Sequence, residues 1–448
     1  MSMRYLGGVI SSTAVVPTTA SAPGVWTLEQ AQYYLSQNSW PVTNLHWIAG
    51  MVPTGGSLSS WGLDTDAYGN VYVTGGMAQA GASYQGLFIA KFNQGGVLQW
   101  IKEIASSSFG NIVKVLGGNL IVFGTYYDPS NGVGLKLTYS TNGVISSEKG
   151  MPSSGNSLYY TSGAIDSSSN VYTGGNLNQS GYNSMYTVKY NSSGTVVWQK
   201  LLSSASGSIY TNPGMAIDST GNVYRVGHSY STGVSPNMLF VKYNSSGVLQ
   251  WQKTISNDTY NSNDTAYGLV IDSSDNVYLS GKTDLSSGGG SSALFVAKFN
   301  SSGTLQWQRI VENVSANYTG VALDTSNNLY VSAGNFLAKY NSSGVIQWQR
   351  SLTNANYMLS IKWQGNSIYV SGSSTGLVAK LADNGSGTGT YTANGVSYVY
   401  SASTNTEYAG YLTITTASFT DSSPSLTETT PTLYELTPTV AAGTAIVN

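Results

Sequence analysis

The sequence predicts an all-β fold, a seven-bladed β-propeller, and three observations lead to this prediction. One phrase recurs about every fifty residues: an alternating apolar run, a polar turn ending in Gly, and a second run with Trp. A strand ending in Asp and an Asn-Val-Tyr strand precede most copies. Together these give four short antiparallel strands in each of seven repeats, which is the pattern of a propeller. Clear copies of the phrase occupy residues 87–102, 186–200, 238–253, 295–309 and 336–350.

Residues 1–42 precede the repeats. Thr27-Leu28-Glu29-Gln30 fits a capping box, which predicts a short helix over 28–36, and Trp40-Pro41 ends the segment. The run from GGVISSTAVV to SQNSWP resembles an N-terminal segment found on many structural proteins of marine tailed phages. That resemblance implies a docking arm on a virion protein. A disordered arm is the alternative.

The repeats span residues 43–382. Their Asp and Asn-Val-Tyr elements predict strands a and b, and two degenerate copies at 119–121 and 366–369 bring the number to seven. The pattern D…GNVYVTG…FVAKxNxxGxxxW closely resembles the SBBP-type bacterial β-propeller repeat. The resemblance implies the fold but no particular activity, because functions differ among proteins that share a fold.

The seventh repeat predicts how the ring closes. It has strands a to c over residues 359–381 but no Trp-containing strand d. The missing strand is expected at the start of the ring, where residues 45–48 match residues 98–101. An N-terminal strand in the last blade would remove two free sheet edges.

Residues 383–448 follow the repeats as a Thr-rich tail. Pro424, Pro431 and Pro438 are seven residues apart, which forbids a continuous helix. We therefore expect an extended or β tail, and a disordered low-complexity tail is the alternative.

The loops predict where binding occurs. The a–b and c–d turns are short and repeated, whereas the b–c and d–a loops are long and varied, and variable loops on a rigid scaffold usually carry binding. These loops are rich in Tyr, Asn and Ser, which suit sugar rings, although Tyr can also merely pack over its neighbours. The candidate ligand-binding residues are Tyr84, Tyr126, Tyr127, Tyr159, Tyr160, Tyr210, Tyr260, Tyr267, Tyr318 and Tyr357.

Composition argues against several kinds of site. Only 8% of residues are charged and the net charge is −2, so we expect neither a nucleic-acid nor a membrane partner. There is no Cys and there are two His, so we expect no metal centre and no cofactor. His228 has no assignable acid or nucleophile beside it, and no catalytic residue is expected. The N-terminus is a poor signal peptide.

Most basic residues are locked to the repeat, which indicates a structural role. The Lys residues are expected at one strand-c position in all seven repeats, each near a repeated Asp. The Lys are Lys91, Lys136, Lys189, Lys242, Lys298, Lys339 and Lys380, and the Asp are Asp64, Asp166, Asp218, Asp272 and Asp324.

The preferred hypothesis is a bacteriophage virion structural protein, a propeller appendage on the particle surface. It would be a tail-fibre-like adhesin or a head decoration that presents its loops to a host glycan. Residues 1–42 and 383–448 would contact other virion proteins or sister copies. The alternatives are a bacterial surface or secreted (extracellular) binding module, and a polysaccharide-degrading enzyme, for which the loop acids offer no recognisable carboxylate pair.

Overall fold

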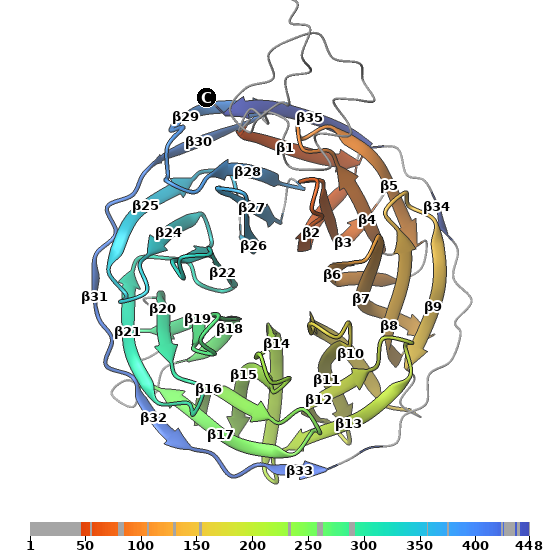
Figure 1. Ribbon diagram of the computed structural model, residues 1–448, viewed down its shortest axis with the longest axis vertical. Helices are drawn as coiled ribbons and strands as arrows, with labels where there is room; N and C mark the ends of the chain where they lie inside the picture. Colours follow the sequence, from red (N-terminus) through yellow and green to blue (C-terminus); the bar gives the residue numbers. More distant parts are fainter. Residues whose placement is uncertain are drawn as a thin grey trace, which may run out of the picture.

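The computed structural model describes residues 46–53, 56–78, 85–104, 107–128, 131–151, 155–231, 234–257, 263–285, 292–355, 357–373, 376–422, 424, 435–436 and 440–447. Seven antiparallel sheets stand as blades around a central channel (Figure 1). These ranges contain no helix, and so none that could cross a membrane. The all-β, seven-bladed fold is confirmed. The expected arm at 1–42, with its helix, lies outside the described residues.

Each blade has strands a, b, c and d from the channel outward. Blades 1 to 3 follow chain order, and their strands are β2 (Ser57–Thr65), β3 (Val71–Ala78), β4 (Gly86–Phe92), β5 (Leu98–Ile104); β6 (Ser108–Leu116), β7 (Asn119–Asp128), β8 (Asn131–Ser140), β9 (Ile145–Met151); and β10 (Ser157–Ile165), β11 (Val171–Gln179), β12 (Tyr182–Tyr190), β13 (Val196–Ser203).

Blades 4 to 6 follow the same order. Their strands are β14 (Gly207–Ile217), β15 (Val223–Ser231), β16 (Val234–Tyr243), β17 (Leu249–Ser256); β18 (Thr265–Ile271), β19 (Val277–Asp284), β20 (Ser292–Phe299), β21 (Leu305–Glu312); and β22 (Thr319–Leu323), β23 (Leu329–Ala333), β24 (Phe336–Tyr340), β25 (Ile346–Leu352).

Blade 7 combines both ends of the described chain. Its strands a to c are β26 (Met358–Gln364), β27 (Ser367–Gly372) and β28 (Val378–Ala382). β1 (His46–Pro53) pairs antiparallel with β28, with Trp47 opposite Lys380. Trp47 has no exposed surface, and its Nε1 donates a hydrogen bond to the carbonyl of Gln94 in blade 1 at 2.9 Å. β1 therefore occupies the strand-d position of this blade.

A row of three side chains crosses strands b, c and d at one level of six blades. We call it the Tyr–Lys–Trp row, because its members are direct cross-strand partners, as Tyr72, Lys91 and Trp100 are. In each row the Lys Nζ lies over the Tyr ring, 4.8 to 5.9 Å from its centroid. The other rows are Tyr172–Lys189–Trp198, Tyr224–Lys242–Trp251, Tyr278–Lys298–Trp307, Tyr330–Lys339–Trp348 and Tyr369–Lys380–Trp47.

Blade 2 has no such row. Ile121, Thr138 and Ser147 stand at the three positions. Lys136 lies two residues before the Lys position, and its Nζ is 3.5 Å from the ring centroid of Tyr190 in blade 3. The prediction that Lys136 belongs to the repeated set is therefore wrong. A shift of two residues keeps a side chain on the same face of a strand, so the alternating pattern concealed it.

The Trp of a row also joins its blade to the next one. Trp307 of blade 5 donates from Nε1 to the carbonyl of Ser342 in blade 6 at 3.2 Å, and its ring stacks on Tyr340. Gly344 has a φ of 76°, and a Cβ there would lie 2.6 Å from the Trp307 ring. Asn341 Oδ1 accepts the N–H groups of the same turn. The Asn-Ser-Ser-Gly phrase thus forms a turn that the Asn side chain caps. The backbone of its Gly packs against the Trp ring of the preceding blade.

A carboxylate closes the a–b turn of five blades. Asp218 accepts hydrogen bonds from Thr220, from the backbone and side chain of Asn222, and from the Tyr224 hydroxyl. Burial alone would raise the pKa of Asp218, but the bonds from Asn222 and Thr220 outweigh it and lower the pKa. The five caps are Asp66, Asp166, Asp218, Asp272 and Asp324.

Blade 1 corrects one member of the predicted Asp set. The cap there is Asp66, four residues before Asn70, and not Asp64. The predicted Lys–Asp contacts are confirmed in blades 4 to 6, at Lys242–Asp218 (3.8 Å), Lys298–Asp272 (3.5 Å) and Lys339–Asp324 (3.5 Å). Lys91 and Lys189 donate to carbonyls of the next blade instead.

The hydrophobic cores lie between neighbouring blades. One cluster joins Tyr278 and Val296 of blade 5 to Leu329 and Val331 of blade 6. Another joins Trp47 of blade 7 to Phe88 of blade 1. Each blade therefore depends on both neighbours for burial of its apolar faces.

The described strands of the C-terminal tail lie along the outside of the ring (Figure 1). We call its described residues, 389–422, 424, 435–436 and 440–447, the C-terminal belt. It visits the blades in reverse order and adds outer strands to all of them except blade 2 within the described residues. Its strands are β29 (Gly389–Ala393) and β30 (Val396–Ala402) on blade 6, β31 (Glu407–Ala409) on blade 5, β32 (Thr413–Thr416) on blade 4, β33 (Thr420–Ser422) on blade 3, β34 (Glu435–Leu436) on blade 1 and β35 (Val440–Val447) on blade 7.

The belt is in register with the blades. The residue three positions after the row Trp pairs with Ser401, Tyr408, Thr415 and Ser422 in blades 6, 5, 4 and 3, which are steps of seven residues. The same position pairs with Leu436 in blade 1 and Gly443 in blade 7, again seven apart. The seven-residue period of the tail sequence therefore equals one blade.

Candidate binding face

Every strand a begins on the same face of the ring, which we call the loop face because the b–c and d–a loops lie there. The opposite face, the turn face, carries the a–b and c–d turns. The described Tyr candidates lie at strand ends on the loop face. They are Tyr126 and Tyr127 at the end of β7, Tyr159, Tyr160, Tyr210 and Tyr267 near the starts of β10, β14 and β18, and Tyr318 and Tyr357 just before β22 and β26.

One aromatic arc runs across blades 1 to 3. Trp61 of β2 meets Phe109 of β6 edge-on at 5.5 Å between ring centroids. Phe109 contacts Tyr127 at 6.2 Å, and Tyr127 contacts Tyr159 of β10 at 6.1 Å. Burial raises the pKa of Tyr127, and the neighbouring Tyr159 raises it further. Three blades thus share one continuous aromatic strip.

A second aromatic arc runs across blades 5 to 7. Tyr267 of β18 contacts Tyr318 at 5.4 Å, and Tyr318 contacts Tyr357 at 6.2 Å with the two rings nearly perpendicular. Tyr318 is 49% exposed and Tyr357 is 39% exposed, whereas burial raises the pKa of Tyr267. This arc therefore offers solvent-exposed rings supported from below by a half-buried one.

Blade 4 supplies a stacked pair between the two arcs. The Tyr210 and His228 rings lie 5.1 Å apart and 14° from parallel. Burial lowers the pKa of His228 to about 4, so its imidazole is neutral at neutral pH. Its Nδ1 is buried without a hydrogen-bond partner among the described residues.

Sequence reasoning missed Trp61 and Phe109. A signal was present, because an aromatic residue directly precedes Gly at the start of strand a in Trp61-Gly62, Phe109-Gly110 and Tyr267-Gly268. At Trp61 and Tyr267 the strand pairing shifts register, as at a β-bulge, and bulges re-aim side chains.

One predicted site residue is wrong. Tyr160 has no exposed surface and packs in the core against Phe123 and Tyr186, because consecutive strand residues point to opposite faces and Tyr159 takes the outward one. Tyr126 is half-buried against the core between blades. Tyr84 and Tyr260 lie outside the described residues.

Two acids of the loop face are engaged in structure. Asp264 and Asp284 are fully buried in blade 5. Asp264 accepts the backbone N–H of Asn257, and Asp284 accepts from Asn263 and pairs with Lys282 at 3.2 Å. Asp128 is exposed at the end of β7. Asp264 and Asp284 thus belong to a buried polar network in blade 5.

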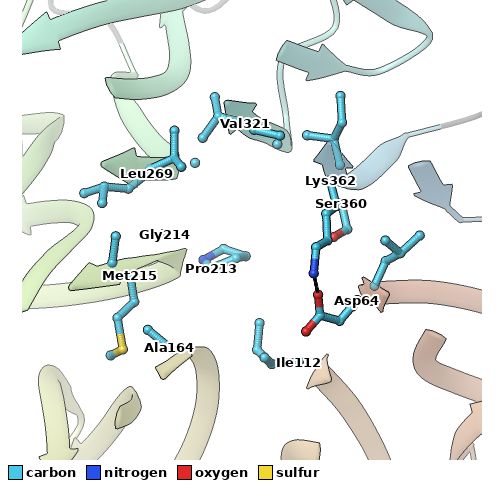
Figure 2. Close-up of a pocket in the computed structure, with 18 of the residues that line it drawn as sticks. Asp64, Ile112, Ala164, Pro213, Gly214, Met215, Leu269, Val321, Ser360 and Lys362 are labelled. Atoms are coloured by element: carbon cyan, nitrogen blue, oxygen red, sulfur yellow. Dashed lines mark hydrogen bonds and ion pairs between the residues drawn. The ribbon is translucent and has the colours of Figure 1, made fainter. Parts of the chain in front are cut away.

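The central channel encloses about 560 Å³ and is lined by the seven a strands (Figure 2). Trp61 and Tyr267 line it toward the loop face, and Lys362 and Trp363 line it toward the turn face. The aromatic arcs therefore surround one opening of the channel.

Comparisons with known proteins found similarity to solved structures alone. No protein-family model and no curated protein matches the chain. Among solved structures it is similar to a catalytically inactive virginiamycin B lyase from Staphylococcus aureus with quinupristin, at 11% identity, 75% of this chain, 99% of that chain and a TM-score of 0.49. It is similar to BamB from Moraxella catarrhalis at 13% identity, 72% and 85% coverage and a TM-score of 0.40.

A third similar structure is PorZ of Porphyromonas gingivalis, a bacterial surface component of the type-IX secretion system. The identity is 12%, the match covers 77% of this chain and 54% of PorZ, and the TM-score is 0.43. The chain is a β-propeller protein, as its seven sheets show.

Proposed function

We propose that the chain is a non-enzymatic binding protein whose loop face holds a neutral glycan. The observation that supports this is the pair of aromatic arcs around the channel opening, with exposed rings at Tyr318 and Tyr357. Tyr rings offer flat apolar area for the C–H faces of sugars, together with a hydroxyl for hydrogen bonding. The low charge of the chain suits a ligand that needs no electrostatic steering.

The proposed setting is the surface of a bacteriophage particle. The resemblance of residues 1–42 to the N-terminal segment of phage structural proteins supports it. The protein would be a tail-fibre-like or head-decorating appendage, attached through residues 1–42 and the outer side of the C-terminal belt. The loop face would then point toward the host surface. Cryo-electron microscopy of the particle tests this, and a loop face turned toward the capsid with a free N-terminal arm would contradict it.

Glycan binding is tested with the full chain on an array of neutral polysaccharides, followed by titration calorimetry of the best ligand. Tyr318→Ala and Tyr357→Ala should each weaken binding about fivefold, because each removes a stacking contact worth about 1 kcal/mol. Tyr68→Ala is the matched control, since Tyr68 is 60% exposed in an a–b turn on the opposite face.

Equal affinity of all three variants and the parent would contradict the binding face. Turnover of a polysaccharide by the purified chain would replace the proposal with an enzymatic function. A ligand bound equally by Tyr68→Ala and the parent but not by Tyr318→Ala supports the proposal.

A further inference from the structure

Charge gathers on one wall of the central channel (Figure 2). Each strand a places one residue opposite the row Tyr, or opposite Ile121 in blade 2. At this level blades 7, 1 and 2, which are neighbours in the ring, carry Lys362, Asp64 and Lys114. The other four blades carry Ala164, Ala216, Val270 and Ala322. The repeat supplies an apolar residue at this position, and three blades depart from it together.

The carboxylate of Asp64 is already occupied. Its Oδ1 forms an ion pair with Lys362 Nζ, and its Oδ2 accepts the backbone N–H of Val115 at 2.8 Å. The Asp64 side chain is 9% exposed, so little of it is left to solvent. The Asp64–Lys362 pair is therefore a closed unit that bridges blades 1 and 7.

Lys114 adds a second cation beside this unit. Its Nζ has no hydrogen bond or ion pair to a described residue, and Asp64 is the only acidic residue among those that line the channel. Burial in the channel lowers the pKa of Lys114, while Asp64 raises it and Lys362 lowers it. Two Lys side chains therefore share one carboxylate, and the formal charge of these three residues is +1.

We infer that the channel binds a small oxyanion, a phosphate or a carboxylate, beside Lys114 and Lys362. A cleft lined by one excess charge with low-dielectric walls concentrates counter-ions. An ammonium group that donates to a charged oxygen forms a charge-assisted hydrogen bond, which is stronger than a neutral one. The channel volume of about 560 Å³ exceeds the size of either group. This site is separate from the aromatic arcs and does not depend on glycan binding.

Calorimetric titration of the full chain at neutral pH tests the inference with two probes, inorganic phosphate and glucuronate. Lys114→Met should weaken binding of the effective probe about tenfold, because it removes one charged donor but leaves the Asp64–Lys362 pair intact. Asp64→Asn should strengthen binding, because the amide oxygen can still accept from Val115 while the opposing charge is gone. A response to phosphate alone identifies a free phosphate site, and one to glucuronate alone identifies a sugar acid.

The matched control is Lys149→Met, because Lys149 lies on β9 of the same blade as Lys114 but on its outer side. It should bind as the parent does. Failure of the parent to bind either probe at millimolar concentration overturns the inference. So does equal binding by Lys114→Met and Lys149→Met. Far-ultraviolet circular dichroism confirms that each variant is folded.

Discussion

Two junctions of the ring differ in how they are held. Between blades 5 and 6, Trp307 stacks on Tyr340, donates to Ser342 and lies under Gly344. Between blades 2 and 3, Ser147 stands at the Trp position, and Gly194 has no atom within 4 Å of where its Cβ would be. Lys136 over Tyr190 is the contact that replaces the indole. Blade 2 also has four strands in the described structure, whereas blade 6 has six.

Blade 2 shows which residues a blade requires and which repeated residues only strengthen it. Blade 2 keeps its four strands, its register and its packing on both neighbours without a Tyr–Lys–Trp row or an Asp cap. Its a–b turn uses Gly117 and Gly118, both at positive φ, as a tight hairpin turn does. The alternating apolar faces therefore specify a blade, and the repeated polar residues reinforce its junctions.

The largest expected effect is at the indole. Trp307→Ala should lower the free energy of unfolding by about 2 kcal/mol, less than for a fully buried Trp because Trp307 is partly exposed. Ser147→Ala should change it by about 0.5 kcal/mol or less, as for a surface substitution. Urea unfolding measures both. Equal losses would mean that the two junctions are held by the same forces.

The turn glycines give a smaller contrast. Gly194→Ala should cost about 1 kcal/mol, because its φ is 82° and Ala is strained there. Gly344→Ala has a similar φ of 76° and must also displace the Trp307 ring, so we expect about 1 kcal/mol more. Thermal unfolding compares the pair. An equal cost would show that the Gly serves the turn alone.

Adding the Trp of the row to blade 2 should strengthen the junction between blades 2 and 3. The double variant Ser147→Trp with Lys136→Ile places an indole at the strand-d position and an apolar residue where blade 1 has Ile89. We expect a gain of about 1 kcal/mol in unfolding free energy. The single Ser147→Trp variant is the control. Lys136 still lies over the Tyr190 ring in this variant and blocks the new indole, so we expect no gain in unfolding free energy. A double variant no more stable than the single one would contradict this account.

Low pH should destabilise the a–b hairpins that an Asp caps and leave the a–b hairpin of blade 2 unchanged. The pKa of Asp324 is lowered: burial would raise it, but bonds from Asn328 and Ser326 and the charge of Lys339 outweigh burial. A carboxyl with a lowered folded pKa contributes stability above its ordinary pKa of 3.8, and this is lost as pH falls through the folded value. Hydrogen exchange should therefore rise in the 323–330 hairpin below pH 3.8, but not in the 116–120 hairpin. Asp324→Asn should remove the difference.

Much of the fold was predictable because its signals are local and repeated. The Asn-Ser-Ser-Gly turns and the Trp strands mark each blade, and the match of residues 45–48 to 98–101 pointed to blade 7. The belt was predicted only as an extended or β tail. Its strands form through pairing with edges that are distant in the sequence, such as Lys253 with Thr416, and no local pattern specifies that partner.

The candidate site was harder to predict, because it depends on which alternate residues of each strand face outward. Tyr159 and Tyr160 are adjacent, and only the register of β10 determines which one faces out. Asp64 lies in β2 and Asp66 lies just after its end, and the sequence did not say which of the two caps the turn. The charged wall of the channel was missed because Asp64, Lys114 and Lys362 are far apart in the chain and meet only when the ring closes.

The C-terminal belt has a consequence for how this protein can change in length. Seven residues of the belt correspond to one blade. The number of repeats and the length of the belt must therefore agree. Duplication of one repeat would leave the belt seven residues short of blade 7, where β35 pairs with β1. A gain or loss of a blade must therefore be matched by seven residues elsewhere in the gene. The length of the belt therefore favours a ring of seven blades.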